Sequence, residues 1–245
     1  MLLHREINGT GEPLFFLHTG LQTGGVDFQQ QKEFFQKDYQ VIQPDLRGHG
    51  KSVTDKYSNI ILDSVEDLKE TMDHDNISSA HFSGCSMGGL IALAFAKQYP
   101  EYVKSLALSG ILPRKPTNWK ELTAEDTKQV AEIIKSEEAI AYFDDIHDGD
   151  WRTLLSSTED SDWYPFELTG DLSDLEMPTL FLVGEERELE TKGIEVYPAM
   201  NDKIHVSVIP FAGHNVHLEQ PELYSSILAL FLNNLKAEVL GEDSY

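Results

Sequence analysis

A serine lies at the centre of the stretch Gly84-Cys85-Ser86-Met87-Gly88-Gly89. An apolar run over residues 80–83 precedes it and a helical apolar pattern over residues 90–99 follows it, which predicts a strand, a tight turn and a helix. In such an elbow the serine backbone is strained, so the residues two before and two after must be small. Gly84 and Gly88 meet that demand. The chemistry indicated is nucleophilic attack by the Ser86 hydroxyl, and the flanking signals favour it over a chance glycine-rich turn.

A serine hydroxyl needs a base within hydrogen-bond reach and a third group that orients the base. Of the nine histidines, His214 is the best placed, because it follows the predicted strand 205–209 in a loop beyond that strand's C-terminal end. Open α/β sheets carry their chemistry on this edge. His217 is expected to begin the last helix in a packing or capping role. Cys85 is expected to be a buried and unreactive thiol.

Two preorganised N–H groups must stabilise the oxyanion that forms during acyl transfer. Met87, the residue after the nucleophile, supplies the first through its backbone. We expect the second from the loop after the predicted strand 14–17, where Gly20 is preferred and its neighbours Thr19 and Leu21 stay open.

The composition describes a globular chain and argues against several classes of function. At 245 residues the chain can bury one sizeable core, and no apolar run approaches the ~20 residues of a membrane-spanning helix. A formal charge of −23 argues against nucleic-acid binding. The single cysteine allows neither an intrachain disulfide nor a cysteine-based zinc site. The start lacks a signal-peptide pattern, so we expect a cytoplasmic protein with a small-molecule substrate, no cofactor, no metal and no membrane partner.

Strand and helix signals alternate along most of the chain, which is typical of a mostly parallel sheet covered on both faces. Between about residues 113 and 170 the alternation stops, and acidic helical segments rich in aromatic residues occur without a strand signal. We expect an α/β core over residues 1–112 and 171–245, a helical insertion over 113–170 and a frayed tail over 237–245. Strands are predicted at 2–7, 14–17, 39–42, 80–83, 103–108, 179–183 and 205–209, and helices at 27–37, 60–74, 90–99, 123–136, 137–145, 193–200 and 221–236.

Four segments together resemble the α/β-hydrolase fold superfamily: the elbow around Ser86, the loop His18-Thr19-Gly20, the glycine-rich loop 45–52 and the pair Gly213-His214. They occur in the family's order, and the resemblance covers nearly the whole chain. It implies an α/β fold with a mostly parallel sheet of the eight-stranded type, flanked by helices. Residues 113–170 would be a helical cap inserted after the sixth strand, over the active site. Aromatic residues of the cap would line a substrate pocket or pack against the core.

The sequence departs from the family pattern at the acid that would orient His214. The family commonly places an aspartate three residues past a glycine after the strand 179–183, and here Gly184-Glu185-Glu186-Arg187 puts an arginine there. Arginine cannot accept the imidazole N–H. Glu186 and Glu188 flank the position, and we expect one of them to serve, without ranking the two. The alternative is that these glutamates are surface charges and that the chain works with a Ser–His dyad or is impaired.

A serine at the elbow favours acyl transfer through an acyl-enzyme. The resemblance therefore implies a serine hydrolase that acts on a small carboxylic ester or a related acyl substrate, with Ser86 as nucleophile and His214 as base. Two alternatives stay open. One is a non-catalytic small-ligand receptor or sensor on the same fold, suggested by the arginine at the acid's place. The other is a carbon–carbon hydrolase or lyase that uses the same Ser–His pair.

Overall fold

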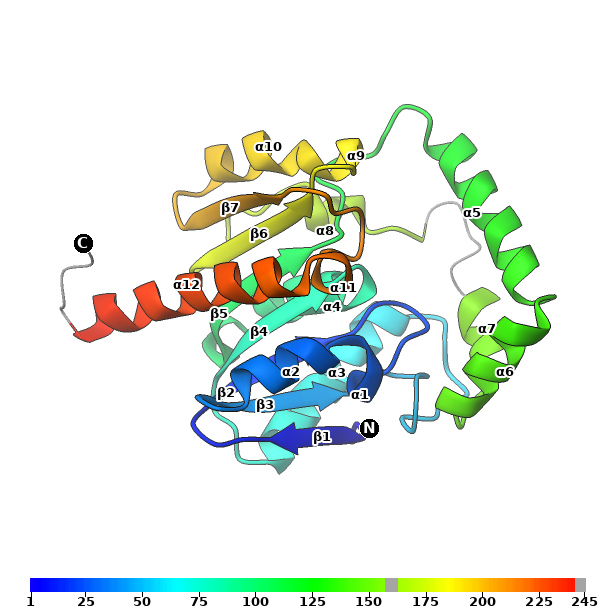
Figure 1. The fold of residues 1–245 in the computed structure, drawn as a ribbon, viewed down its shortest axis with the longest axis horizontal. Coiled ribbons are helices and arrows are strands. Elements are labelled where there is room, and N and C mark those ends of the chain that lie inside the picture. The colour runs from blue at the N-terminus through cyan, green and yellow to red at the C-terminus, as the bar shows by residue number, and fades with distance from the viewer. Residues whose placement is uncertain (157–162, 241–245) are drawn as a thin grey trace.

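A sheet of seven strands runs through the computed structural model, which describes residues 1–156 and 163–240 (Figure 1). The strand order is β1-β3-β2-β4-β5-β6-β7, and only β1 at the edge is antiparallel to its neighbour. Parallel neighbours joined by helical crossovers are the pattern that the alternating sequence predicts. The strands are β1 (Arg5–Asn8), β2 (Glu12–Leu17), β3 (Tyr39–Pro44), β4 (Ala80–Cys85), β5 (Val103–Ser109), β6 (Thr179–Gly184) and β7 (Ile204–Ile209).

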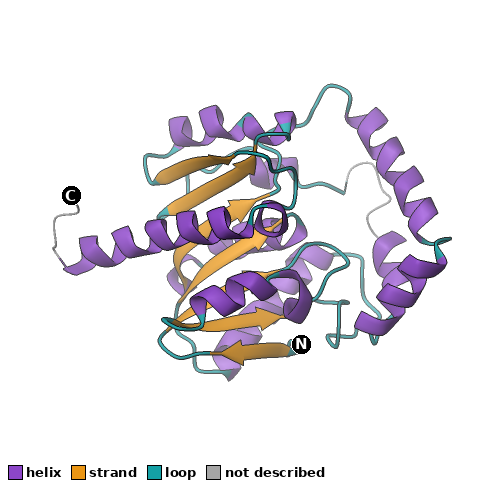
Figure 2. Cartoon of the chain, viewed as in Figure 1, coloured by secondary structure: helices purple, strands orange, loops and turns teal. Residues whose placement is uncertain are grey.

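Helices cover both faces of this sheet (Figure 2). None of the helices in the described part of the chain combines the length and apolar character needed to cross a bilayer. The helices are α1 (Gly24–Asp27), α2 (Gln29–Phe35), α3 (Ile60–His74), α4 (Met87–Gln98), α5 (Trp119–Ile133), α6 (Glu137–Ile146), α7 (Trp151–Ser156), α8 (Phe166–Thr169), α9 (Glu188–Thr191), α10 (Gly193–Met200), α11 (Val216–Glu219) and α12 (Pro221–Leu240), with a 3₁₀ turn η1 (Pro100–Tyr102).

The core consists of two large hydrophobic clusters, one on each face of the sheet. Successive side chains of β2 alternate between them: Phe15 and Leu17 join the cluster that holds α3 and α4, and Leu14 and Phe16 join the one that holds α2 and α12. This is the period of two that a strand requires. Strands buried on both faces read as continuous apolar runs, which is why the central strands could be predicted from short hydrophobic segments.

The α/β class and the mostly parallel sheet are confirmed. The described sheet has seven strands, the number of strand segments predicted from the pattern, so within this sheet the helical segment follows the fifth strand, β5. In Figure 1, α5, α6 and α7 stand beyond the ends toward which the parallel strands point. Residues 157–162 of the predicted insertion and 241–245 of the predicted tail lie outside the described residues.

Several elements differ from the sequence-based expectation, three of them as follows. The helix predicted over 27–37 is two short helices that meet at Phe28, whose φ of −104° and ψ of 34° interrupt the helical path. The last helix continues to Leu240, four residues past its predicted end at 236. The four-residue helix α9 was not predicted, and it carries a residue that matters for the site.

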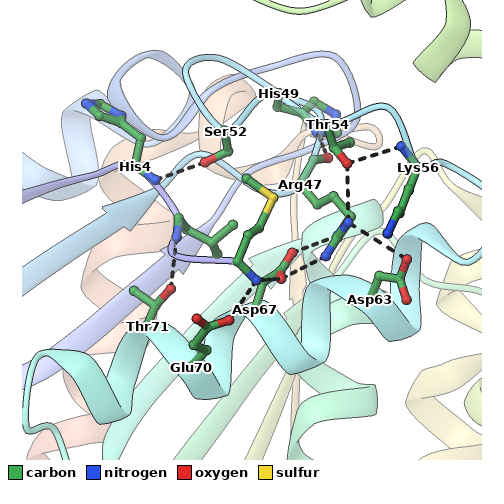
Figure 3. Close-up of polar contacts among 12 residues, drawn as sticks. His4, Arg47, His49, Ser52, Thr54, Lys56, Asp63, Asp67, Glu70 and Thr71 are labelled. Atoms are coloured by element: carbon green, nitrogen blue, oxygen red, sulfur yellow. Dashed lines mark hydrogen bonds and ion pairs between the residues drawn. The ribbon is translucent and has the colours of Figure 1, made fainter.

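The glycine-rich loop after β3 is held against α3 by a buried ion pair (Figure 3). The guanidinium of Arg47 binds both carboxylate oxygens of Asp67, with Nε–Oδ2 and Nη2–Oδ1 distances of 2.7 and 2.9 Å. Asp67 is 1% exposed and also receives the N-terminal amine of Met1. Two parallel N–H···O contacts fix orientation as well as distance. The Arg47–Asp67 pair therefore fixes the position of this loop at the C-terminal edge of the sheet.

We predict that Arg47→Met lowers the free energy of unfolding by about 2–3 kcal/mol, because it leaves the buried Asp67 carboxylate with the amine alone. Urea denaturation followed by circular dichroism measures the loss. The matched control is Lys69→Met, which removes the exposed ion pair between Lys69 and Asp73 and should leave the denaturation midpoint nearly unchanged. Equal effects of the two variants would contradict a stabilising role for the Arg47–Asp67 pair.

Candidate active site

Ser86 lies between β4 and α4 in a strained backbone conformation. Its φ is 55° and its ψ is −120°, values that a side-chain-bearing residue adopts only when its surroundings enforce them. Its amide donates to the carbonyl of Ser109 on the adjacent strand β5 (3.0 Å), and its own carbonyl accepts the amide of Leu90 (2.9 Å). The turn is thus tied to the sheet on one side and to the helix on the other.

The two glycines of the elbow permit this turn for the steric reason given by the motif. A Cβ on Gly84 would lie 2.4 Å from the carbonyl oxygen of Gly88, and a Cβ on Gly88 would lie 2.1 Å from the carbonyl oxygen of Leu17. Both distances are far inside van der Waals contact, and the clashing atoms belong to the backbone, which cannot move aside. Gly88 thereby brings the first turn of α4 against the end of β2.

Cys85 is fully buried on the opposite side of the sheet, in the cluster that contains α12. Its Sγ lies 3.6 Å from the carbonyl oxygen of His214. Burial raises the pKa of the thiol far above its ordinary value. The thiolate is therefore not accessible at neutral pH, as expected from its place in the elbow.

His214 projects from the loop after β7, which the carboxylate of Glu219 holds in place. Glu219 accepts the amides of Gly213 (2.7 Å) and Asn215 (2.9 Å), the residues on either side of the histidine. A Cβ built on Gly110 would lie 2.9 Å from both His214 Cε1 and the Ser86 nitrogen. The imidazole and the nucleophile's backbone are therefore neighbours across Gly110, which has the positive φ of 65° that glycine tolerates.

The carboxylate that contacts His214 belongs to Glu190. It does not belong to either of the two glutamates predicted from the sequence. Glu190 Oε1 lies 2.8 Å from His214 Nδ1, and the Glu190 side chain is 2% exposed. Glu186 and Glu188 are both exposed. Glu188 instead lines a surface cavity of about 480 Å³ together with Arg114 and Lys192. The expectation of Glu186 or Glu188 as the partner of His214 is therefore wrong.

The short helix α9 explains this displacement. The chain turns into a helix at Glu188, so residues 188 and 190 point in different directions, about 200° apart around the helix axis at 3.6 residues per turn. The side chain of Glu190 faces inward and that of Glu188 faces outward. A sequence pattern that counts residues from Gly184 assumes a loop and misses this rotation. Helical spacing from Arg187 would have indicated Glu190, its i,i+3 partner.

Arg187 occupies the position where the family commonly has its aspartate, and it binds the displaced acid. Its Nε lies 3.1 Å from Glu190 Oε1, the same oxygen that contacts His214.

Met87 and Gly20 lie next to each other, as the oxyanion prediction requires. Met87 is the first residue of α4, and an N–H in the first turn of a helix has no partner within that helix. A Cβ on Gly20 would lie 3.7 Å from the terminal methyl of Met87. The amide of Thr19 already donates to Asp27 Oδ2 (2.7 Å). Of the three candidates for the second oxyanion donor, Gly20 and Leu21 therefore remain.

His18 and His147 hold this loop from two sides. His18 Nε2 accepts the amide of Leu46 (2.9 Å), so its proton is on Nδ1, which donates to the carbonyl of Thr19 (2.8 Å). Burial lowers the pKa of His18, which keeps this tautomer neutral. His147, at the end of α6, accepts the amide of Gly50 on Nδ1 (2.8 Å) and donates from Nε2 to the carbonyl of Leu21 (3.0 Å). The insertion is thereby bonded directly to the predicted oxyanion loop.

The arrangement places a base with a buried carboxylate behind it beside a strained serine and two candidate amide donors. Such a site can perform nucleophilic acyl transfer without a metal ion. In the described part of the chain, no three His, Cys, Asp or Glu side chains converge as metal ligands would.

We predict that Cys85 in the folded protein reacts at least about 100-fold more slowly with Ellman's reagent than a free cysteine, because its thiol is buried and its pKa is raised. Absorbance at neutral pH measures the rate. The same protein in concentrated guanidinium chloride is the control and should release one equivalent. Rapid reaction of the folded protein would place the thiol at the surface.

The family model described as the alpha/beta hydrolase fold matches residues 12–137, slightly more than half of the chain. Among curated relatives, 3-oxoadipate enol-lactonase 1 of Acinetobacter baylyi is 24% identical, and the match covers 94% of this chain and 93% of the lactonase. Esterase YbfF of Escherichia coli is 27% identical, and the match covers 80% of this chain and 84% of the esterase.

Among solved structures, a meta-cleavage product hydrolase of Pseudomonas fluorescens shares the fold with a TM-score of 0.76 and 20% identity, over 94% of each chain. The family match begins with β2, passes through the elbow and reaches the start of α6. The chain therefore belongs to the α/β-hydrolase fold family.

Proposed function

We propose that this protein is a serine hydrolase that cleaves a small carboxylic ester or a related acyl substrate through an acyl-enzyme on Ser86. His214 is the base, and Glu190 is the acid that orients it. The observation that carries the proposal is the 2.8 Å hydrogen bond between His214 Nδ1 and the buried carboxylate of Glu190. A carboxylate in this position can orient the base, a role that the sequence led us to expect of Glu186 or Glu188.

The Glu190 contact determines which nitrogen of His214 faces the reaction. An ionised carboxylate only accepts hydrogen bonds, so Nδ1 carries the proton and Nε2 keeps its lone pair. Nε2 takes the proton of the Ser86 hydroxyl as Oγ attacks the acyl carbon. It then delivers that proton to the leaving group when the tetrahedral intermediate collapses. In the second half-reaction, His214 activates water in the same way and the acid product leaves.

Arg187 places a guanidinium nitrogen 3.1 Å from the same oxygen of Glu190 that contacts His214. A carboxylate buried without such partners would be costly to ionise. With Arg187 on one side and the imidazole on the other, Glu190 can offset the positive charge that His214 acquires during attack. The negative charge on the substrate oxygen would be accepted by the amides of Met87 and Gly20.

Two relatives support an ester-type substrate. One is named as an esterase and the other as an enol-lactonase, and a lactone is a cyclic ester. We further propose that residues 113–170 act as a cap over the site, because α5, α6 and α7 stand beyond the ends toward which the parallel strands point (Figure 1) and because His147, at the end of α6, is bonded to the oxyanion loop at Leu21. The proposal keeps a small molecule as substrate and the cytoplasm as location, with no cofactor, nucleic-acid or membrane partner.

The two alternative functions differ in the observations that support them. The receptor hypothesis rested on Arg187 at the acid's place, and Glu190 removes that reason because the histidine has a carboxylate after all. Carbon–carbon hydrolysis stays the second candidate, because a structural relative is named as a meta-cleavage product hydrolase. Incubation in ¹⁸O-labelled water separates hydrolysis, which incorporates the label, from a lyase reaction, which does not.

We predict that a fluorophosphonate probe labels the folded protein on Ser86 and that Ser86→Ala abolishes both labelling and hydrolysis of p-nitrophenyl acetate. Peptide mass spectrometry identifies the labelled residue, and release of p-nitrophenol measures the rate. Ser109→Ala is the matched control, because its hydroxyl is buried on the neighbouring strand. If the folded protein is neither labelled nor active on a panel of short-chain esters and lactones, the proposed function fails.

Glu190→Gln is expected to lower kcat by about 10²–10⁴-fold, because the amide keeps the shape of the side chain but cannot offset an imidazolium charge. Glu186→Gln and Glu188→Gln remove the same charge from exposed positions nearby, and each should leave kcat within about twofold of the parent enzyme. Steady-state kinetics with p-nitrophenyl acetate compares the three. A larger loss from Glu186→Gln or Glu188→Gln would reassign the acid.

A further inference from the structure

A buried carboxylate outside the Ser86–His214–Glu190 set joins two loops of the site. We propose that Asp27 is a positioning residue that holds the oxyanion loop in register with the segment carrying His214. The proposal rests on the proposed function, since it assigns Asp27 a role in the same reaction. Nothing in the sequence pattern had singled out Asp27 or linked it to the chemistry.

Asp27 reaches the oxyanion loop through a backbone amide. It is the last residue of α1 and is 2% exposed, and its Oδ2 accepts the amide of Thr19 at 2.7 Å. Thr19 directly precedes Gly20, the candidate second donor. A charge-assisted hydrogen bond of this length fixes the peptide between His18 and Thr19, whose N–H it engages. The next peptide carries the Gly20 N–H, so the Asp27 carboxylate anchors the loop one residue before the candidate donor.

The other oxygen of Asp27 binds a histidine that belongs to the His214 segment. Asp27 Oδ1 lies 3.1 Å from Nε2 of His217, three residues after His214, and both side chains are fully buried. Because a carboxylate only accepts, His217 Nε2 is the donor. The ring of His217 also stacks on Phe28, with centroids 4.1 Å apart. One carboxylate thus bonds to the loop after β2 and to the helix after β7.

The charge of Asp27 is maintained in spite of its burial. Desolvation alone would raise the pKa of this carboxyl, but His217, the Thr19 amide and His18 outweigh it, and the pKa lies below its ordinary value. Asp27 is therefore ionised at neutral pH. A buried charge is an expensive way to dock helices, since apolar packing would achieve docking at lower cost.

Docking of α1–α2 onto α11 has other contacts that do not reach the oxyanion loop. Gln31 Nε2 donates to the carbonyl of His217 at 2.8 Å, and Phe28 packs on the His217 ring. Among the hydrogen bonds of residues 1–156 and 163–240, those of Asp27 connect this interface to Thr19. The structure therefore separates two roles, since Gln31 serves docking alone and Asp27 serves both docking and loop position. The two residues form a matched pair for an experiment.

The test compares Asp27→Leu, Asp27→Asn and the control Gln31→Leu. Asp27→Leu removes both hydrogen bonds and should lower kcat for p-nitrophenyl acetate about 10- to 100-fold with little change in KM, because a displaced oxyanion donor weakens the transition state and not substrate binding. Asp27→Asn keeps an oxygen that accepts the Thr19 amide, and its NH2 donates to His217 Nε2 when the imidazole carries its proton on Nδ1, so it should recover activity to within about threefold of the parent. Gln31→Leu should lower the melting temperature without changing kcat.

Two further readouts distinguish positioning from general stability. Phenylboronic acid forms a tetrahedral adduct with an active serine, and its affinity should fall in Asp27→Leu in proportion to kcat. Hydrogen–deuterium exchange of the peptide that contains Thr19, Gly20 and Leu21 should accelerate in Asp27→Leu and not in Gln31→Leu. The exchange measurement needs no catalytic activity.

Asp27→Leu with the kcat of the parent, or with a loss no greater than that of Gln31→Leu, would overturn the positioning role. So would unchanged exchange in the Thr19–Leu21 peptide. If the parent protein itself neither hydrolyses esters nor reacts with a fluorophosphonate, the proposed function fails. The exchange comparison would still decide whether Asp27 holds the loop, so the two failures are distinguishable. If Asp27→Leu does not fold, Asp27→Ser is tested in its place. The serine side chain is polar but carries no charge, and it is too short to make the hydrogen bonds with Thr19 and His217.

Discussion

The close approach of α4 to the end of β2 is the constraint on which the site depends. At Gly88, the helix backbone lies so near the carbonyl oxygens of Leu17 and His18 that a methyl group would be 2.1 and 2.6 Å from them. This contact brings the start of α4, with the Met87 amide, beside the loop that begins at His18. Backbone packing of α4 against the end of β2 thus places Ser86 beside the loop that begins at His18. Because such packing tolerates no extra atom, the motif demands glycine there.

The carboxylate beside His214 is positioned by a different kind of element, the short helix α9. In this chain the aspartate position after β6 holds Arg187, and the carboxylate comes from Glu190, three residues later on α9. One helical turn brings residues 187 and 190 to the same side. The arginine at the aspartate position therefore contacts the carboxylate of Glu190. Glu190 Oε1 lies 2.8 Å from His214 Nδ1. A carboxylate therefore lies beside the imidazole, although its residue type and position differ from the family pattern.

The difference between these two elements explains how much could be predicted from the sequence. The central strands, the elbow, Ser86 and the loop of His214 follow from hydrophobic period and local sterics, which act over a few residues. The partner of His214 depends on whether residues 188–191 form a loop or a helical turn, and a four-residue helix leaves no periodic signal. Asp27 is harder still, since its role comes from contacts with Thr19 and His217, and the latter is 190 positions away in the chain. Tertiary contacts of this kind have no local signature.

The segment after β7 contains two histidines three residues apart, and each is bonded to a buried carboxylate. Glu190 holds Nδ1 of His214, and Asp27 holds Nε2 of His217. Exposure separates their roles: the His214 side chain is 34% exposed and that of His217 is 0%. A proton carrier must reach both substrate and water, and of these two histidines His214 has that access, which suits the base of the proposed mechanism. The same pair of residue types therefore suits the proposed catalysis at one position and the proposed alignment at the other, because their solvent access differs.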